Sequence, residues 1–170
     1  WLQRYTPWVG HDAEADGPTR SYGLLLDVSG CAHLFGGERR MLEDIKARFA
    51  ARGIALRAAI AGTVGAAWGL ARFSATSMDM VVLPPHQEAD AMMSLPPAAL
   101  RLPPQHVELC QKLGLTRVAQ LASFERAALT RRFGPLPVMR LEQALGQVGE
   151  AVNPCLPPPQ FLVQKLLPHG

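Results

Sequence analysis

The sequence lacks several features that would place a chain in a functional class at once. No apolar run reaches the roughly 18 residues of a membrane-spanning helix, and no leader with a charged and then apolar pattern follows Trp1. Cysteine is scarce: Cys31, Cys110 and Cys155 are an odd number, lie far apart and form no Cys-x-x-Cys pair. These absences exclude a disulfide framework or zinc knuckle and favour idle thiols in a reducing cytoplasm.

Charge of one sign and catalytic motifs are also sparse. Lys plus Arg exceeds Asp plus Glu by only 17 to 14, so the net charge of +3 permits nucleic acid as a partner without arguing for it. The sequence contains no GxSxG, GxxxxGK[ST] or HExxH motif. Residues 62–69 (GTVGAAWG) match no phosphate-loop spacing, and we interpret them as small residues that allow close helix packing. Cys31 and His33 alone make no metal site.

Proline and glycine are abundant instead, with 15 of each in 170 residues. Pro-Pro pairs or runs stand at 84–85, 96–97, 103–104 and 157–159, and each disfavours helix before and through it. They divide the chain, which is long enough for one ordinary domain or two small ones. The first residue is not Met, and we expect the sequence to be a piece of a longer protein.

Before the first Pro-Pro pair, apolar spacing predicts alternating strands and helices. Strands are expected over 22–29, 56–61 and 80–83, the first of them buried, and helices over 38–52 and 64–73. Thr63 is expected to cap the second helix, and Gly53 to end the first. The order strand, helix, strand, helix, strand (βαβαβ) indicates one sheet with helices packed on it.

After that pair, every periodic segment is helical. Five short helices are predicted, over residues 88–93, 105–113, 117–122, 125–133 and 136–145. Gly114, Gly134 and Gly146 each follow a helix, where a positive φ is needed, while Thr116 and Ser123 are expected N-caps. The fold class is therefore α+β, with a small all-α module following the sheet.

Acidic residues give little support for catalysis. Asp27 is the one acid inside a predicted strand, and a single acid there is more often a structural hydrogen-bond acceptor than a catalyst. Asp12, Glu14 and Asp16 fall in a polar stretch that we expect to be a solvated loop. A two-metal site needs several carboxylates close together, and no such group is evident.

Basic residues are more informative. Arg126, Arg131, Arg132 and Arg140 fall within one stretch that is free of acids until Glu142. Guanidinium groups beside the exposed N–H groups of a turn at Gly134 suit a phosphate. The alternative is that arginines at a helix C-terminus interact with the helix dipole and stay solvated.

The order of these segments resembles that of Y-family (translesion) DNA polymerases. Residues 22–37 (YGLLLDVSGCAHLFGG), the helix after them, residues 53–73 and residues 81–85 (VVLPP) are similar to the second half of the family's palm domain. The resemblance implies a partial ferredoxin-like palm over 1–85 and a thumb of helix-hairpin-helix type over 86–152. It also implies a linker and the start of a little-finger domain over 153–170, where FLVQKLL (161–167) begins a strand.

The sequence departs from the family where its chemistry is done. Active members carry adjacent Asp and Glu where this chain has Tyr22 and Gly23, so the resemblance implies no catalytic residue and no Mg²⁺ ligand here. The family's nucleotide-contacting Lys has no counterpart, and Arg72 is the one cation nearby. The first thumb hairpin, Gly-x-Gly in the family, is replaced by 102–104 (Leu-Pro-Pro), which removes N–H donors. The turn at Gly134 is expected to keep its donors.

The resemblance therefore implies a non-catalytic, DNA-binding scaffold in SOS-induced error-prone translesion synthesis, acting in the bacterial cytoplasm at the nucleoid. Its implied partners are primer-template DNA, a sliding clamp, a RecA-like accessory subunit and an error-prone replicative-type polymerase, with no cofactor and no membrane. The residues assigned to the DNA backbone are Arg131, Arg132, Gly134, Arg126, Arg101 and Lys112. Two alternatives stay open: an active translesion polymerase with a divergent metal site, and a module that binds only proteins.

Overall fold

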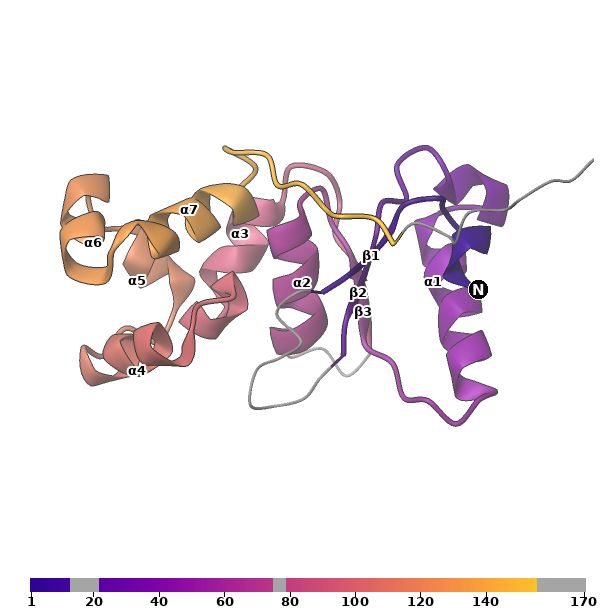
Figure 1. The fold of residues 1–170 in the computed structure, drawn as a ribbon, viewed down its shortest axis with the longest axis horizontal. Coiled ribbons are helices and arrows are strands. Elements are labelled where there is room, and N and C mark those ends of the chain that lie inside the picture. The colour runs from indigo at the N-terminus through magenta and orange to yellow at the C-terminus, as the bar shows by residue number, and fades with distance from the viewer. Residues whose placement is uncertain (13–21, 75–78, 156–170) are drawn as a thin grey trace, which may run out of the picture.

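The computed structural model describes residues 1–12, 22–74 and 79–155. The molecule is elongated (Figure 1). Helix α1 lies toward one end, helices α4 to α7 lie at the other, and the strands and helix α2 lie between them. The structure is mixed helix and sheet, which agrees with the α+β class predicted from the sequence.

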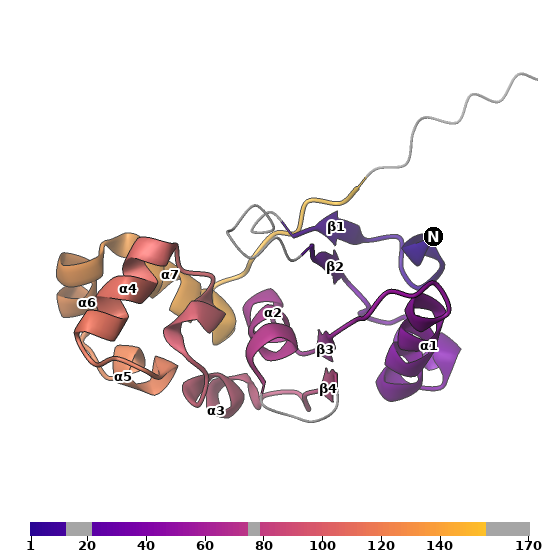
Figure 2. The ribbon, with the colours of Figure 1, turned by 90° about the horizontal axis from the view of Figure 1, so that it is seen from below.

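Four short strands form two separate pairs. Strand β1 (Val9–His11) pairs with β2 (Leu24–Leu26) in antiparallel fashion, and β3 (Ala58–Ile60) pairs with β4 (Met80–Val82) in parallel. The prediction of one three-stranded sheet is therefore wrong for the described residues, in which no hydrogen bonds join β2 to β3. Figure 2 shows the four strands in a row, with α1 on one side and α2 on the other.

Strand β2 is also less covered than predicted. Its residues are exposed or half-buried, with Leu24 43% exposed and Tyr22, just before it, 91% exposed. The apolar run over 22–29 therefore does not form the buried strand that the sequence predicts. Asp27 follows the strand and is exposed, so the expectation of an acid inside a buried strand is wrong; its carboxylate accepts a hydrogen bond from the Ser29 N–H at 3.0 Å.

Helix α1 (Glu38–Ala50) forms as its apolar spacing predicts and buries Met41, Leu42 and Ile45. Met41 and Ile45 pack with Tyr5 and Val9 in the smaller of two hydrophobic cores. Short 3-10 turns stand at Leu2–Arg4 and Ala32–Phe35. Gly53, with φ of 70°, lets the chain turn away after the helix, as predicted.

Helix α2 (Val64–Phe73) starts at Thr63, whose hydroxyl accepts from the Ala66 N–H at 3.1 Å as an N-cap. Its small residues do allow close packing, as the sequence predicts. A Cβ added at Gly65 would lie 2.9 Å from the Cα of Ala144 in α7, and one at Gly69 would lie 3.0 Å from the carbonyl oxygen of Ala99. The small face of α2 therefore meets the helical module.

The module consists of five short helices and a 3-10 turn. Their bounds are α3 (Glu88–Met93), the turn Pro97–Leu100, α4 (Pro104–Lys112), α5 (Val118–Ala122), α6 (Arg126–Phe133) and α7 (Pro135–Ala144). Gly114, Gly134 and Gly146 have φ of 71°, 79° and 75°, which confirms the predicted turns.

The two predicted N-caps of the module are wrong. Helix α5 begins after Arg117, and the Gln120 carboxamide oxygen accepts from the N–H groups of Thr116 and Arg117 at 2.7 and 2.9 Å. Ser123 ends α5, and its hydroxyl donates to the Gln120 carbonyl at 2.8 Å. Helix α6 begins only after Glu125. Gln120 is the third residue of α5, and its side chain reaches back to the N–H of the N-cap residue Arg117, as the N3 residue does in a capping box.

The larger hydrophobic core contains residues from both sides of the expected division at 85/86. Ala66 and Leu70 of α2 pack in it with Met92 of α3, Leu121 of α5 and Phe133 of α6, among others. Half-buried side chains of β3 and β4 pack against the same core. Helix α2 thus joins the sheet to the helical module.

Residues 150–155 return from the module to the sheet. Pro154 forms an isolated bridge with Gly10, and the Cys155 N–H donates to the Val9 carbonyl at 2.7 Å. A Cβ at Gly10 would lie 2.6 Å from Val152, so glycine is needed for this close approach. The first residues of the expected linker at 153–170 therefore pair with β1. Residues 156–170, which include the expected strand at 161–167, lie outside the described residues.

The smaller core has a polar edge that makes stability depend on pH. The Asp44 carboxylate accepts from Arg48 Nε at 2.9 Å and from the Tyr5 hydroxyl, and these two hydrogen bonds lower the pKa of Asp44. A lowered pKa in the folded state stabilises the protein above the ordinary carboxyl pKa, and this stabilisation is lost as the pH falls through the lowered value. Acid unfolding between pH 6 and pH 2, roughly the range of carboxyl titration, measures this effect, and we expect Asp44→Asn to weaken the pH dependence of the free energy of unfolding.

Candidate nucleic-acid interface

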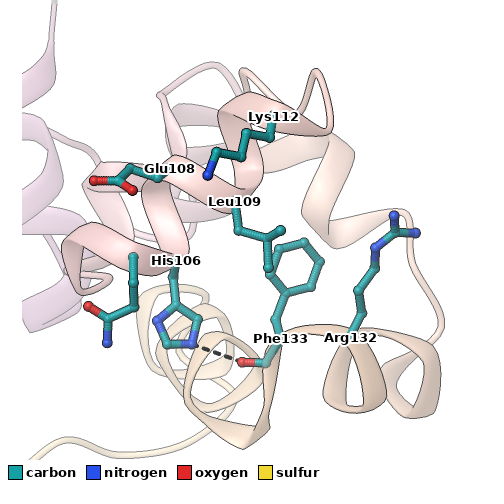
Figure 3. A pocket seen from close by; sticks show the side chains of 7 residues that line it. His106, Glu108, Leu109, Lys112, Arg132 and Phe133 are labelled. Atoms are coloured by element: carbon teal, nitrogen blue, oxygen red, sulfur yellow. Dashed lines mark hydrogen bonds between the residues drawn. The ribbon is translucent and has the colours of Figure 1, made fainter.

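An open hollow with a volume of about 410 Å³ lies between α4 and the end of α6. Its lining residues come from these two helices: Gln105, His106, Glu108, Leu109, Lys112, Arg132 and Phe133. Figure 3 shows Leu109 and Phe133 together on its floor, with Lys112 on one side and Arg132 on the other. The hollow therefore places two cations around an apolar base.

His106 fixes the two helices to each other. Its Nε2 lies 2.9 Å from the carbonyl oxygen of Phe133, the last residue of α6 (Figure 3). Because a carbonyl can only accept, Nε2 carries the hydrogen and donates it. The contact supplies a donor to one of the carbonyls left without a helical partner at the end of α6. No local sequence pattern signals this contact, because the two residues are 27 positions apart.

Three of the assigned basic residues are exposed cations of this region. Lys112, Arg131 and Arg132 are solvent-exposed, and none of them forms an ion pair within the described part of the chain. Glu108 shares the hollow with Lys112 and Arg132, so the local excess of positive charge is small. Exposed, unpaired Lys and Arg side chains can contact phosphate without first breaking an internal contact.

The other two assigned cations are held by carboxylates. Arg101 is buried, with its side chain 5% exposed, and both of its terminal nitrogens donate to Glu150 at 2.5 Å. Arg126 pairs with Glu142 at 2.7 Å, although its own side chain is 73% exposed. The structure therefore does not bring Arg101 to the surface with the other assigned residues.

The turn at Gly134 has fewer donors than expected. The Gly134 N–H donates to the Thr130 carbonyl at 2.8 Å, and Pro135 and Pro137, in the first turn of α7, have no N–H. Leu136 is thus the one residue among the first three of α7 that has a backbone N–H. The expectation that this turn keeps its donors is wrong, and any grip on phosphate here depends on the side chains of Arg131 and Arg132.

The residues present do not fit the divalent cation that active members of the resembled family use. Tyr22 points into solvent, Gly23 has no side chain, and the Asp27 carboxylate accepts from a backbone N–H. Asp12 lies nearby but is ion-paired with Arg72 at 2.7 Å, so the expectation of a solvated Asp12 is wrong. Within the described ranges, no three His, Cys, Asp or Glu side chains gather as metal ligands. Glu14 and Asp16 lie outside the described residues.

None of the described helices is both long enough and apolar enough to cross a membrane. Taken together, the chain is an α+β protein in which a helical module with exposed cations is packed, through α2, on short strand pairs.

Comparison with known proteins gives the relationship. The chain is 44% identical over 153 residues to Protein ImuB of Caulobacter vibrioides strain NA1000/CB15N, and equally to Protein ImuB of strain ATCC 19089. The match covers 90% of this chain and 31% of each relative. The chain is therefore homologous to part of ImuB and spans about a third of its length. No protein-family model matches the chain. No solved structure matches it either.

Proposed function

We propose that this chain is the palm–thumb part of a non-catalytic, Y-family-polymerase-like scaffold that binds DNA in mutagenic DNA damage tolerance. The observation that carries the proposal is the 44% identity to ImuB over 90% of the chain. By this proposal, residues 1–85 are the palm half and 86–152 the thumb. The full protein would act in SOS-induced translesion synthesis, in the bacterial cytoplasm at the nucleoid.

The DNA contact is proposed for the surface around the hollow. Lys112 and Arg132 line the hollow, Arg131 is the exposed neighbour of Arg132 on α6, and cations of this kind bind the DNA backbone without regard to sequence. Arg126 can add to the contact from its exposed position, although Glu142 competes for it. Gly134 contributes indirectly: its positive φ forms the turn between α6, which carries the arginines, and α7.

This contact predicts a loss of affinity on removing both arginines. Arg131→Ala with Arg132→Ala should weaken binding to primer-template DNA about five- to tenfold, whatever its sequence, because two phosphate contacts are lost. The slope of log affinity against log salt should become shallower by about 1 to 2. Fluorescence anisotropy at several salt concentrations measures both quantities.

A matched control exists on α1. Arg39 and Arg40 are also adjacent and exposed, but α1 lies at the other end of the molecule (Figure 1). Arg39→Ala with Arg40→Ala removes the same charge and should change affinity much less. Equal losses in the two double variants would contradict a DNA contact at the end of α6.

The non-catalytic part of the proposal has its own test. With the intact protein, primer-template, nucleotides and Mg²⁺ or Mn²⁺, we expect no primer extension, because Tyr22 and Gly23 supply no carboxylate. Extension that Asp27→Ala abolishes would favour the alternative, an active polymerase with a divergent metal site. The proposed clamp, RecA-like and polymerase partners of the full protein would be tested by co-purification with it.

A further inference from the structure

Asp12 and Gly23 face each other where β1 ends and β2 begins. The Asp12 N–H donates to the Gly23 carbonyl at 3.0 Å, which continues the ladder of the strand pair by one bond. Asp12 is almost fully buried, with its side chain 2% exposed. A buried carboxylate is costly unless it is paired, so its partners determine whether this arrangement is stable.

Two of those partners come from one face of α2. The Asp12 Oδ2 accepts from Trp68 Nε1 at 2.8 Å and from Arg72 Nη2 at 2.7 Å. The Arg72 guanidinium also lies over the Trp68 ring, 4.3 Å from its centroid. Positions 68 and 72 are one helical turn apart, so α2 presents both donors to the same oxygen. We call Asp12, Trp68 and Arg72 the Asp12 cluster.

The Asp12 cluster explains why position 23 is glycine. A Cβ at Gly23 would lie 2.6 Å from Asp12 Oδ2, 2.8 Å from Asp12 Cβ and 3.0 Å from Arg72 Nη2. The backbone of Gly23 has no positive φ, so the requirement is for space. Since Asp12 Oδ2 is held by two donors, it cannot swing aside to admit a side chain.

We propose that the Asp12 cluster takes the place of a bound divalent cation at this end of the β1–β2 pair. The guanidinium of Arg72 supplies the positive charge that a metal would bring to the carboxylate, and Asp12 fills the space that an acidic side chain at position 23 needs. This inference rests on the proposed non-catalytic function and deepens it. An acid placed at position 23 alone would therefore not restore a metal site.

The test is thermal unfolding of the full chain, with and without millimolar Mn²⁺ and with no DNA present. Arg72→Gln and Asp12→Asn should each lower the Tm by about 5 °C or more, and the double variant by less than the sum, because the two groups act as a pair. Asp12→Asn should leave any Mn²⁺-induced change in Tm as it is in the parent protein. Lys46→Gln, which breaks an exposed ion pair with Asp79, should lower the Tm much less.

Position 23 provides the second arm. Gly23→Glu and Gly23→Ala should lower the Tm to a similar extent, because the first side-chain carbon already collides, and neither should gain Mn²⁺-induced stabilisation. A Mn²⁺ response in the parent protein that Asp12→Asn abolishes would overturn the inference, as would additive losses in the double variant. These unfolding measurements do not depend on DNA affinity. DNA affinity tests the proposed function separately.

Discussion

Glu150→Ala should lower the free energy of unfolding by about 3–5 kcal/mol, the cost of removing one partner from a buried ion pair. Glu150 accepts two hydrogen bonds from Arg101 and one from Arg140, and the three side chains are 14%, 5% and 17% exposed. Without the carboxylate, two guanidinium groups crowd each other where water reaches them poorly. Urea unfolding monitored by tryptophan fluorescence measures the loss.

The backbone of Arg101 adds to this expectation. Arg101 has a φ of 55°, a left-handed conformation that is unfavourable for a residue with a Cβ and that persists only when its surroundings hold it. The contacts of the Arg101 side chain with Glu150 belong to those surroundings, so we expect their loss to make this conformation harder to keep. Glu150→Gln, which keeps the shape, gives a second measurement if the alanine variant does not fold.

Glu142 is the matched control for this experiment. It also pairs with an arginine, but the partner, Arg126, is 73% exposed. Glu142→Ala should therefore cost about 1 kcal/mol or less, as exposed pairs do. If Glu150→Ala cost no more than Glu142→Ala, the buried cluster would not have the stabilising role assigned to it.

Gly65→Leu should cost about 2–3 kcal/mol by forcing α2 and α7 apart. A Cβ at this position lies 2.9 Å from the Ala144 Cα and 3.2 Å from its backbone nitrogen, so the contact is with backbone, which cannot rotate away. Leucine favours helix over glycine by up to about 1 kcal/mol, which does not offset the overpacking. Thermal unfolding in the calorimeter measures the net effect.

Gly149 supplies the comparison for Gly65. A Cβ there meets no atom within 4 Å, and Gly149→Ala should leave stability nearly unchanged. Gly65→Ala should fall between the two, because its methyl group meets the same backbone with fewer atoms. A Gly65→Leu variant as stable as the parent protein would contradict the close packing of α2 on α7.

The helices of this protein could be predicted from sequence because their signals are local. Apolar spacing predicted the ends of α1, α2 and α3 to within two residues. Thr63 caps α2 as predicted, and the glycines expected after helices have a positive φ. Turn formation at glycine and the cap at Thr63 depend on neighbours a few positions away, which a single sequence displays, whereas the caps expected at Thr116 and Ser123 were wrong.

The strand pairing and the Asp12 cluster could not be predicted in this way. Strand β1 has three residues, one of them Gly10, and depends on its pairing with β2 rather than on its own propensity. Asp12 finds its partners 56 and 60 positions away, so its polar sequence neighbours indicated solvent wrongly. Arg101 was misplaced for the same reason, because its carboxylate partner is 49 positions away.

The shared core of α2 and the helical module has a consequence for motion. If the protein bound DNA by a hinge motion, few contacts would be expected between the strands with α2 and the helical module. Instead, Ala66 and Leu70 of α2 are buried in one core with Met92 and Leu121 of the module. Separating α2 from the module would expose Ala66 and Leu70 together with the side chains of the module that pack against them. We therefore expect one cooperative unfolding transition, with amides of α2 and α7 exchanging hydrogen at the same slow rate.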